Sequence, residues 1–304
     1  MNFVHLAPGA GSTRGLVVAL GTFDGVHVGH RAIVAAAKKE STVLGTDTAV
    51  LIFSASPHGA GCILPLGDRL REFRALGVNL AVVCDFDELR TLTPEAFFSE
   101  ILIDKLGAAA VFAGYNYRFG AKAAGDTERL RTLCAAQGVA CHVTPCVELD
   151  GAPVSSTRIR ALLAAGDVEA ANRLLGYAYY LRGEVLHGKA LGRTLGMPTV
   201  NQRFADGCVV PAHGVYYTTV EADGAILPAV TNVGTRPTVS AGEAVDAETH
   251  ILHYDGDLYG KTVTVRFLAR GRAETKFADA EALRTAVMRD IAAAAAYFER
   301  EGTE

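Results

Sequence analysis

The feature of this sequence that most constrains its fold is a change of periodicity near the middle of the chain. Up to about residue 143, short runs that are apolar throughout alternate with segments in which apolar residues recur at helical spacing. Beyond about residue 180, apolar and polar residues alternate one by one. Strands that are buried on both faces are typical of parallel sheets covered by helices, whereas one-by-one alternation is typical of half-buried strands. The sequence therefore predicts an α/β half followed by an antiparallel β half.

Five apolar runs in the first half are interpreted as buried strands, and four segments between them have helical spacing. Thr93 followed by Pro94 is typical of a helix start, and three glycines stand where helices should stop. A further helical stretch is expected from about Ser156 to Leu175. This order predicts a parallel sheet covered by helices on both faces. The strand runs are 16–20, 48–53, 80–86, 109–114 and 139–143, and the helical segments are 30–40, 68–77, 94–107 and 128–138.

The second half favours a small antiparallel barrel or sandwich that one helix closes. In the run TVTVRFLAR at 262–270, Val263, Val265 and Phe267 fall on one face of a strand, and polar residues fall on the other. We expect a domain boundary that leaves residues 1–178 in a first domain and 179–304 in a second. The other expected strands are 214–222, 225–233 and 247–254, and the closing helix is expected over 280–298.

Composition excludes several classes of protein. The chain has 304 residues and a formal net charge of −4, so nothing in its charge indicates a nucleic-acid or membrane partner. The first fifteen residues lack the pattern of a signal peptide, and no run approaches the roughly 18 apolar residues of a membrane span. We therefore expect a cytoplasmic protein. The sequence does not indicate an oligomeric state.

The first candidate site is the string GTFDGVHVGH at 21–30, which leaves the first strand and enters a helix. A helix N-terminus offers unpaired backbone N–H groups and the positive end of the helix dipole, which suits a phosphate. His27 and His30 are three residues apart, so both can donate to one phosphoryl group. Such a pair stabilises the charge that develops on an α-phosphate while pyrophosphate leaves. A single histidine here would more often be a surface or capping residue, but the whole string favours phosphate chemistry.

This string resembles the nucleotidylyltransferase signature, and it matches the bacterial bifunctional riboflavin kinase/FAD synthetases. Further matches follow in order: LTPEAFFSEIL at 92–102, AGYNYRFG at 113–120 and SSTRIRALLAAGDVEAA at 155–171. The resemblance implies that the FMN phosphate attacks the α-phosphorus of ATP. No general base is needed, because a phosphate monoester with a second pKa of about 6 is already largely dianionic. The resemblance assigns ATP to Gly21, Phe23, Gly29, Ser155, Ser156, Thr157, Arg158 and Arg160, and flavin to Asn116 and His58.

One segment departs from the family. The family usually has a TFDPHP-like string after the second strand, whereas this chain reads LIFSASPHGAG at 51–61. Pro57-His58 matches only with a shift, and the aspartate is absent. Because the flavin is expected to approach here, one alternative is a riboflavin kinase whose first domain is weakened or inactive. Two others are a first domain that acts on another phosphate, and a flavin-binding protein without turnover.

The second candidate site begins with GKALGRTLGMPTVN at 188–201. The backbone N–H groups of a glycine-rich loop can wrap phosphates, here around Gly188, Gly192 and Gly196. The hydroxyl of Thr199 and the amide oxygen of Asn201 are hard ligands that suit Mg²⁺. The string resembles the riboflavin kinase signature GRxLGFPTxN, which assigns Thr199 and Asn201 the metal and ATP role.

Downstream, VTNVGTRPTV at 230–239 and the run 246–277 also match the family in order. We predict Glu248 as the catalytic base, which accepts the proton of the riboflavin 5′-hydroxyl as that hydroxyl attacks the γ-phosphate. Arg272 is predicted to help close the flavin pocket. The resemblance implies a Rossmann-like nucleotidylyltransferase domain followed by a six-stranded antiparallel β-barrel. It also implies a protein that phosphorylates riboflavin to FMN and adenylylates FMN to FAD, with ATP and Mg²⁺.

Overall fold

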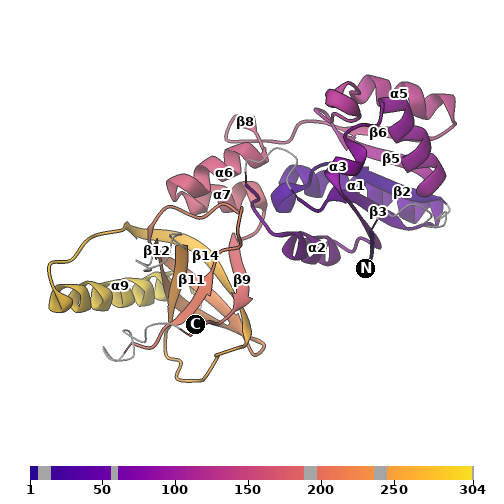
Figure 1. Ribbon diagram of the computed structural model, residues 1–304. Coiled ribbons are helices and arrows are strands. Elements are labelled where there is room, and N and C mark those ends of the chain that lie inside the picture. The colour runs from indigo at the N-terminus through magenta and orange to yellow at the C-terminus, as the bar shows by residue number, and fades with distance from the viewer. Residues whose placement is uncertain (6–14, 56–60, 188–196, 236–244, 303–304) are drawn as a thin grey trace. The chain divides into compact units, whose positions relative to one another are not determined.

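The computed structural model describes residues 1–5, 15–55, 61–187, 197–235 and 245–302 (Figure 1). These residues form two compact units, Met1–Ser156 and Thr157–Glu304. Each unit is built on its own six-stranded sheet. The predicted change of class is confirmed, because the first sheet is parallel and the second is antiparallel. No helix in the described ranges is long and apolar enough to cross a membrane.

The first unit is a Rossmann-like layer of parallel strands with helices along it. The strand order β1-β4-β3-β2-β5-β6 reverses direction at β2, because β3 and β5 pair with its two sides. Ligands of such sheets bind beyond the carboxyl ends of the strands at this switch point. The strands are β1 (Asn2–His5), β2 (Leu16–Leu20), β3 (Thr48–Phe53), β4 (Leu80–Cys84), β5 (Ala108–Gly114) and β6 (Ala140–Thr144), with a small hairpin of β7 (Glu148–Leu149) and β8 (Ala152–Pro153).

The five strands expected in this half are confirmed to within two residues, and three short strands, β1, β7 and β8, were missed. The strand β1 is four residues long and pairs with β4 at the edge of the described sheet, from Asn2 opposite Leu80 to His5 opposite Val83. Four residues are too few to show a clear periodicity, so whether such a segment forms an edge strand depends on the strand with which it pairs.

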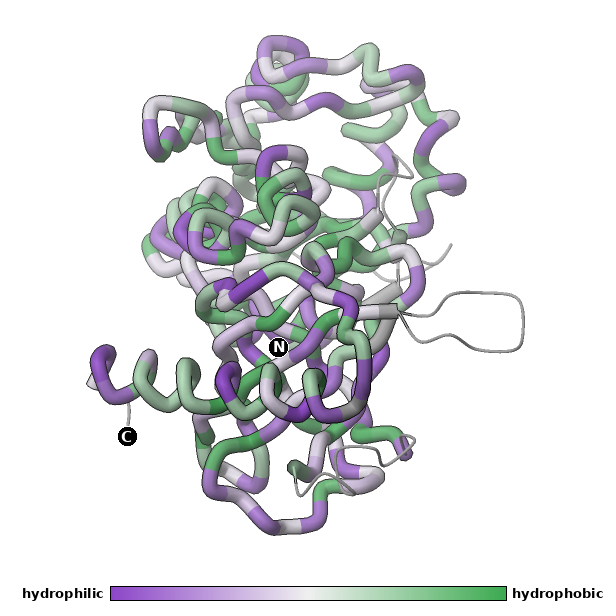
Figure 2. The backbone as a smooth tube through the Cα atoms, turned by 90° about the vertical axis from the view of Figure 1, so that its left-hand side faces the viewer, coloured by the Kyte–Doolittle hydropathy of each residue, from purple (hydrophilic) through white to green (hydrophobic). Residues whose placement is uncertain are grey.

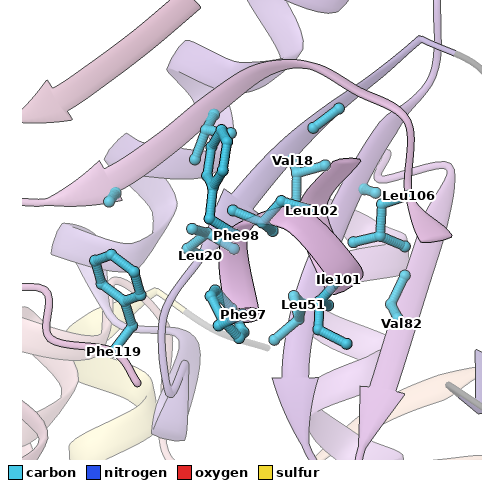
Figure 3. Packing of buried hydrophobic residues seen from close by; sticks show 14 of the residues in the cluster. Val18, Leu20, Leu51, Val82, Phe97, Phe98, Ile101, Leu102, Leu106 and Phe119 are labelled. Atoms are coloured by element: carbon cyan, nitrogen blue, oxygen red, sulfur yellow. The ribbon is translucent and has the colours of Figure 1, made fainter. Parts of the chain in front are cut away.

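The helices of the first unit pack the apolar faces that their spacing predicted, with one change of type. The expected helix 94–107 begins as α4 and continues as a π-helix, η2. Phe97, Phe98, Ile101 and Leu102 of η2 are all buried against strands β2, β3 and β4 (Figure 3). Because a π-helix has a wider turn than an α-helix, the neighbours Phe97 and Phe98 and the neighbours Ile101 and Leu102 can all face the sheet. The helices are η1 (Asp24–Val26), α1 (Val28–Leu44), α2 (Leu66–Ala75), α3 (Phe86–Leu89), α4 (Pro94–Ala96), η2 (Phe97–Lys105), η3 (Ala121–Ala123) and α5 (Thr127–Ala136).

The second unit is the expected antiparallel barrel, with strand order β10-β13-β12-β11-β14-β9. The backbone N–H of Leu186 donates to the carbonyl of Asn201 over 2.8 Å, which brings the two edge strands together. Val263, Val265 and Phe267 are buried, as their alternation predicted. The strands are β9 (Tyr180–Glu184), β10 (Val200–Arg203), β11 (Gly214–Ala222), β12 (Ala225–Thr235), β13 (Val245–Ile251) and β14 (Thr262–Ala273).

The closing helix, α9 (Ala280–Glu301), covers one face of the barrel sheet. Ala294 and Phe298 of α9 are buried against Val215 and Val230 of β11 and β12. Hydrophilic residues gather at the C-terminal end of this helix, which is marked C (Figure 2). The helix therefore packs an alanine-rich apolar stripe against the barrel, and the residues at its C-terminal end are exposed to solvent.

The helical stretch expected over 156–175 is two helices, α6 (Ser156–Ala165) and α7 (Val168–Leu175). Gly166 has a φ of 83° and breaks the stretch, and the Asp167 carboxylate then caps α7 by accepting the Ala170 N–H. The side chain of Asn172 donates to the Phe267 carbonyl and accepts the Tyr179 N–H, over 2.8 and 2.7 Å. By contacts, α7 thus belongs to the barrel unit. The functional boundary at 178/179 stays a prediction.

Replacing Asn172 by alanine should lower the free energy of unfolding of the barrel unit by about 1–3 kcal/mol. The reason is that a buried carbonyl and a backbone N–H both lose their partner. A denaturant titration of the full chain measures this change, if the unfolding transition of the barrel unit is monitored. Replacing exposed Glu299 of α9 by alanine should change that transition by less than about 0.5 kcal/mol. Equal effects of the two variants would contradict the docking role of Asn172.

Candidate active sites

The loop between β2 and α1 is an unusual turn that presents His27. Phe23, Gly25 and Val26 have φ angles of 51°, 75° and 39°. Positive φ is rare for a β-branched residue such as valine, so the surroundings must hold this turn. Glycine is needed at position 25, where a Cβ would lie 2.8 Å from Ile63 Cδ1. The turn brings His27 to the N-terminus of α1 at the carboxyl end of β2.

The two histidines are joined by one hydrogen bond. His27 is the N-cap of α1, and its Nδ1 accepts the backbone N–H of His30 over 3.3 Å. In the neutral ring the proton must then be on Nε2, which can donate to a ligand. The two rings are stacked, with centroids 3.6 Å apart and planes 15° apart. A Cβ at position 29 would lie 3.2 Å from His27 Cε1, so Gly29 leaves room for the ring.

Burial keeps both imidazoles neutral at pH 7. It lowers the pKa of His27 to about 4, and it lowers the pKa of His30 well below its usual value, with a further contribution from His27. His30 retains some exposed surface, but its Nδ1 is buried and has no hydrogen-bond partner among the described residues. The pair can therefore donate hydrogen bonds to a phosphate as neutral imidazoles.

The other candidates of the first site lie in several places. Gly21 follows β2 directly, and Phe23 is fully buried in the turn. Asn116 is exposed just after β5, at the same carboxyl edge of the sheet as the histidine turn. The hydroxyl of Ser156, the last residue of the first unit, donates to the Asp24 carbonyl over 2.9 Å.

Ser155 directly precedes α6, while Thr157, Arg158 and Arg160 lie on α6 in the second unit. His58 lies outside the described residues.

The second unit contains a cavity of about 380 Å³ next to the candidate metal ligands. Thr199 and Asn201 both line it, as expected for residues two apart in an extended chain. Other residues that line the cavity come from β13 and the loop after it, and the sequence did not mark them as part of a site. The loop contains the run HYDGDLYG, which holds two carboxylates. These lining residues are Thr249, Ile251, Tyr254, Asp255, Gly256, Asp257, Leu258 and Tyr259.

Strand register places Glu248 beside Asn201. Glu248 of β13 is directly opposite Asn201 of β10 and, on its other side, Asn232 of β12. Directly opposed residues share a face, with Cβ atoms about 4.5–5.5 Å apart. The predicted base is therefore next to a predicted metal ligand. Asn232, which the sequence analysis did not assign to a site, lies on the other side of Glu248, so that one carboxylate stands between two amide side chains.

Polar contacts support the residues that line the cavity. The Nδ1–H of His250 donates to the Pro198 carbonyl over 2.9 Å, which fixes the backbone just before Thr199. The hydroxyls of Thr218, Thr231 and Thr249 form a chain with spacings of 2.8 Å. This chain crosses the barrel interior and ends at the cavity, because Thr249 lines it.

Arg272, the predicted flavin contact, makes an ion pair within the second unit. Its Nε and Nη2 donate to the two carboxylate oxygens of Asp290 on α9, over 2.9 and 2.7 Å. This hydrogen bond raises the pKa of the guanidinium. The guanidinium also lies 5.6 Å from the centre of the Phe277 ring. Gly188, Gly192 and Gly196 of the predicted phosphate loop lie outside the described residues.

Two family models match this chain. The model described as FAD synthetase matches residues 10–158, and the model described as riboflavin kinase matches residues 175–298. The first range holds the histidine turn, and the second holds the cavity and Glu248.

Relatives match over nearly the whole chain. A bifunctional riboflavin kinase/FMN adenylyltransferase from Pseudomonas fluorescens is 39% identical over 290 residues, which are 93% of each chain. One from Bacillus subtilis is 32% identical over 293 residues, covering 93% of this chain and 92% of the relative. A crystal structure from Streptococcus pneumoniae, described as a macrolide-efflux protein, has a TM-score of 0.86 and 32% identity. It covers 95% of this chain and 97% of that one.

The depressed pKa of His27 predicts a pH dependence of stability. The unfolded chain binds a proton near pH 6.5 and the folded chain near 4, so stability is full above pH 6.5 and is lost as the pH falls toward 4. Between pH 6.5 and 4, the free energy of unfolding of the first unit should therefore fall by about 3 kcal/mol less in His27→Gln than in the wild type. Denaturant unfolding at several pH values measures it. A His27 ring that titrates near pH 6.5 by NMR would contradict the prediction.

Proposed function

Because this chain belongs to the family of bifunctional riboflavin kinases/FMN adenylyltransferases, we propose which of its residues perform each of the two reactions. The chain phosphorylates riboflavin to FMN and adenylylates FMN to FAD, with ATP as co-substrate in both steps. The observation that carries the proposal is that each matched range holds one candidate site: the histidine pair in 10–158, and the pairing of Asn201 with Glu248 in 175–298.

We propose that the histidine turn performs adenylyl transfer. The FMN phosphate attacks the α-phosphorus of ATP, and the bond to pyrophosphate breaks. His27 donates its Nε2–H to the phosphoryl oxygens, because its Nδ1 is already occupied by the His30 N–H. The N-terminus of α1 adds backbone N–H groups and the positive end of a 17-residue helix. Neutral donors suffice, since the attacking phosphate carries its own negative charge.

The remaining first-site residues are proposed to position the two substrates. Gly21, Phe23 and Gly29 shape the backbone that approaches ATP, and Asn116 at the end of β5 contacts the nucleotide or flavin. The motif at the start of α6 (Ser155, Ser156, Thr157, Arg158 and Arg160) is proposed to bind ATP phosphates. His58 is proposed as a flavin contact, by resemblance alone.

We propose that Glu248, beside Asn201 and Asn232 in the sheet, performs the kinase reaction. The Glu248 carboxylate accepts the proton of the riboflavin 5′-hydroxyl as that oxygen attacks the γ-phosphorus of ATP, and ADP leaves. An alcohol needs such a base because it is not ionised near neutral pH. Asn232 and Asn201 flank the carboxylate in register and hold its position. Arg272, which is paired with Asp290 of α9, is proposed to help close the flavin pocket.

The oxygen donors that line the cavity fit Mg²⁺. The Thr199 hydroxyl and the Asn201 amide oxygen are hard ligands, and Asp255 and Asp257 line the same cavity. The residues with described side chains contain no cluster of three or more His, Cys, Asp or Glu that could hold a metal. This suits Mg²⁺, which usually keeps waters and substrate phosphate oxygens as ligands. When bound, the ion neutralises the developing charge on the transferred phosphoryl group.

The remaining expectations are also proposals. We propose that residues 1–178 make up the adenylyltransferase and 179–304 the kinase, and that the protein acts in the cytoplasm without nucleic acid. The net charge of −4 supports the last point. The kinase-only alternative has no support, because both family models match.

The two activities should be separable by single substitutions. Glu248→Gln should lower kcat for FMN formation about 10²-fold to 10⁴-fold and leave the conversion of FMN to FAD unchanged. His30→Ala should lower kcat for FAD formation about 10²-fold to 10³-fold and leave FMN formation unchanged. Chromatography of the flavins over time measures both. Glu221→Gln and His142→Gln, outside both sites, are the matched controls. Loss of both activities in either variant would contradict the assignment.

Removing a metal ligand should change the metal requirement of one reaction only. Asn201→Ala should raise the Mg²⁺ concentration for half-maximal FMN formation about 10-fold or more, because the ion loses a hard oxygen ligand. Adenylylation, measured over the same Mg²⁺ titration, should not change. An unchanged requirement in the kinase reaction would remove Asn201 from the metal site.

A further inference from the structure

The strained turn before His27 is held by hydrogen bonds from three directions. The Ile63 N–H donates to the Asp24 carboxylate over 2.8 Å, and the Ser156 hydroxyl donates to the Asp24 carbonyl over 2.9 Å. From α1, the Nε of Arg31 donates to the Val26 carbonyl over 3.1 Å. A turn with positive φ at phenylalanine and valine persists only where its surroundings fix it. Asp24 takes part in two of these three contacts.

A second buried charge lies near Asp24. Arg69, in the first turn of α2, is 4% exposed, and Asp24 is 7% exposed. The helix α2 packs against η1, the segment that contains Asp24. The negative charge of Asp24 raises the pKa of Arg69 against the larger, opposite effect of burial. Opposite charges are thus buried in the histidine turn and in the helix that packs against it.

The guanidinium of Arg69 connects this turn to the neighbouring strand. Its Nη2 donates to the carbonyls of Phe53 and Ser54, over 3.0 and 3.2 Å, at the carboxyl end of β3. The strands β2 and β3 are adjacent and parallel, so their carboxyl ends form one edge of the sheet. Arg69 therefore holds the strand end where the flavin is expected, from the helix that packs against the segment containing Asp24.

Stability alone is a weak reason for this pair. Burial of two charges costs free energy of desolvation, and apolar residues of similar volume often stabilise a protein as well or better. The Nε of Arg69 is buried without a hydrogen-bond partner among the described residues, which adds to that cost. Such arrangements are retained where they hold a functional geometry.

We propose that Asp24 and Arg69 are positioning residues of the adenylyltransferase, which hold the turn Phe23–Val26 so that His27 and His30 face the α-phosphate of ATP. The inference rests on the proposed role of the two histidines. Neither residue touches the reacting atoms; they act through the backbone of the turn and the end of β3. A displacement of about 1 Å in a catalytic group can cost about 100-fold in rate, which is the scale expected here.

The test is steady-state adenylylation of FMN by the full chain, with kcat and KM for ATP measured separately. Arg69→Met should lower kcat about 10-fold to 100-fold per folded molecule and change KM less, because the histidines act mainly on the transition state. Arg69→Lys, which keeps the charge, should recover part of the loss. Arg129→Lys, at an exposed ion pair with Glu95, is the matched control and should have wild-type kcat.

A double-mutant cycle keeps the test decisive if Arg69→Met folds poorly. Asp24→Asn retains an acceptor for the Ile63 N–H but removes the charge. The kcat losses of Asp24→Asn and Arg69→Lys should be less than multiplicative in the double variant, since each disturbs the same turn. The NMR signals of the His27 ring should shift in both single variants.

The outcomes separate this inference from the proposed function. Unchanged adenylylation in His30→Ala would overturn the role of the histidines and this inference with it. Adenylylation that is lost in His30→Ala but has wild-type kcat in Arg69→Met and Asp24→Asn would overturn this inference alone. Lower thermal stability with wild-type kcat per folded molecule would show that the pair is only structural, and would also overturn it.

Discussion

The hydrogen bond from the His30 backbone N–H to Nδ1 of His27 joins the fold of the first unit to its chemistry. It caps α1, so the helix begins where the strand β2 has just ended. It also fixes the tautomer of His27, so that Nε2 carries the ring proton. The positive φ angles of Phe23 and Val26 are what allow the chain to reach this geometry within seven residues of β2. We propose that the buried charges of Asp24 and Arg69, and the hydrogen bonds to the turn, hold the backbone so that this one contact can form.

Strand register has the corresponding role in the second unit. Residues 201, 248 and 232 are distant in sequence, but the antiparallel pairing of β10, β13 and β12 places them side by side. Asn172 docks α7 against β14, and the Arg272–Asp290 pair fastens α9 to the same strand. The position of Glu248 thus depends on hydrogen bonds of the whole barrel, whereas the position of His27 depends on one turn.

This difference explains what the sequence could predict. The strands β2 to β6 were predictable because each contains a run of mostly apolar residues, and His27 and His30 because their string is local. The break at Gly166 and the edge strand β1 depend on contacts with other elements, so periodicity did not show them. Asn232, Asp255 and Arg69 were missed for the same reason. Each becomes part of a site only through pairing or packing with residues distant in sequence.

The chemistry of the two nucleophiles accounts for the contrast between the two sites. A phosphate that attacks ATP is already anionic, so the first site needs donors that are neutral at pH 7 and do not trap the nucleophile as an ion pair. Burial of the stacked histidines supplies that state. An alcohol that attacks ATP must lose a proton, so the second site needs a carboxylate that water can reach. Glu248 is only half-buried, between two amides that can donate to it but cannot take its charge. On the proposed assignment, the first unit buries its catalytic histidines and the second leaves its base partly open, because one reaction begins from an anion and the other from a neutral hydroxyl.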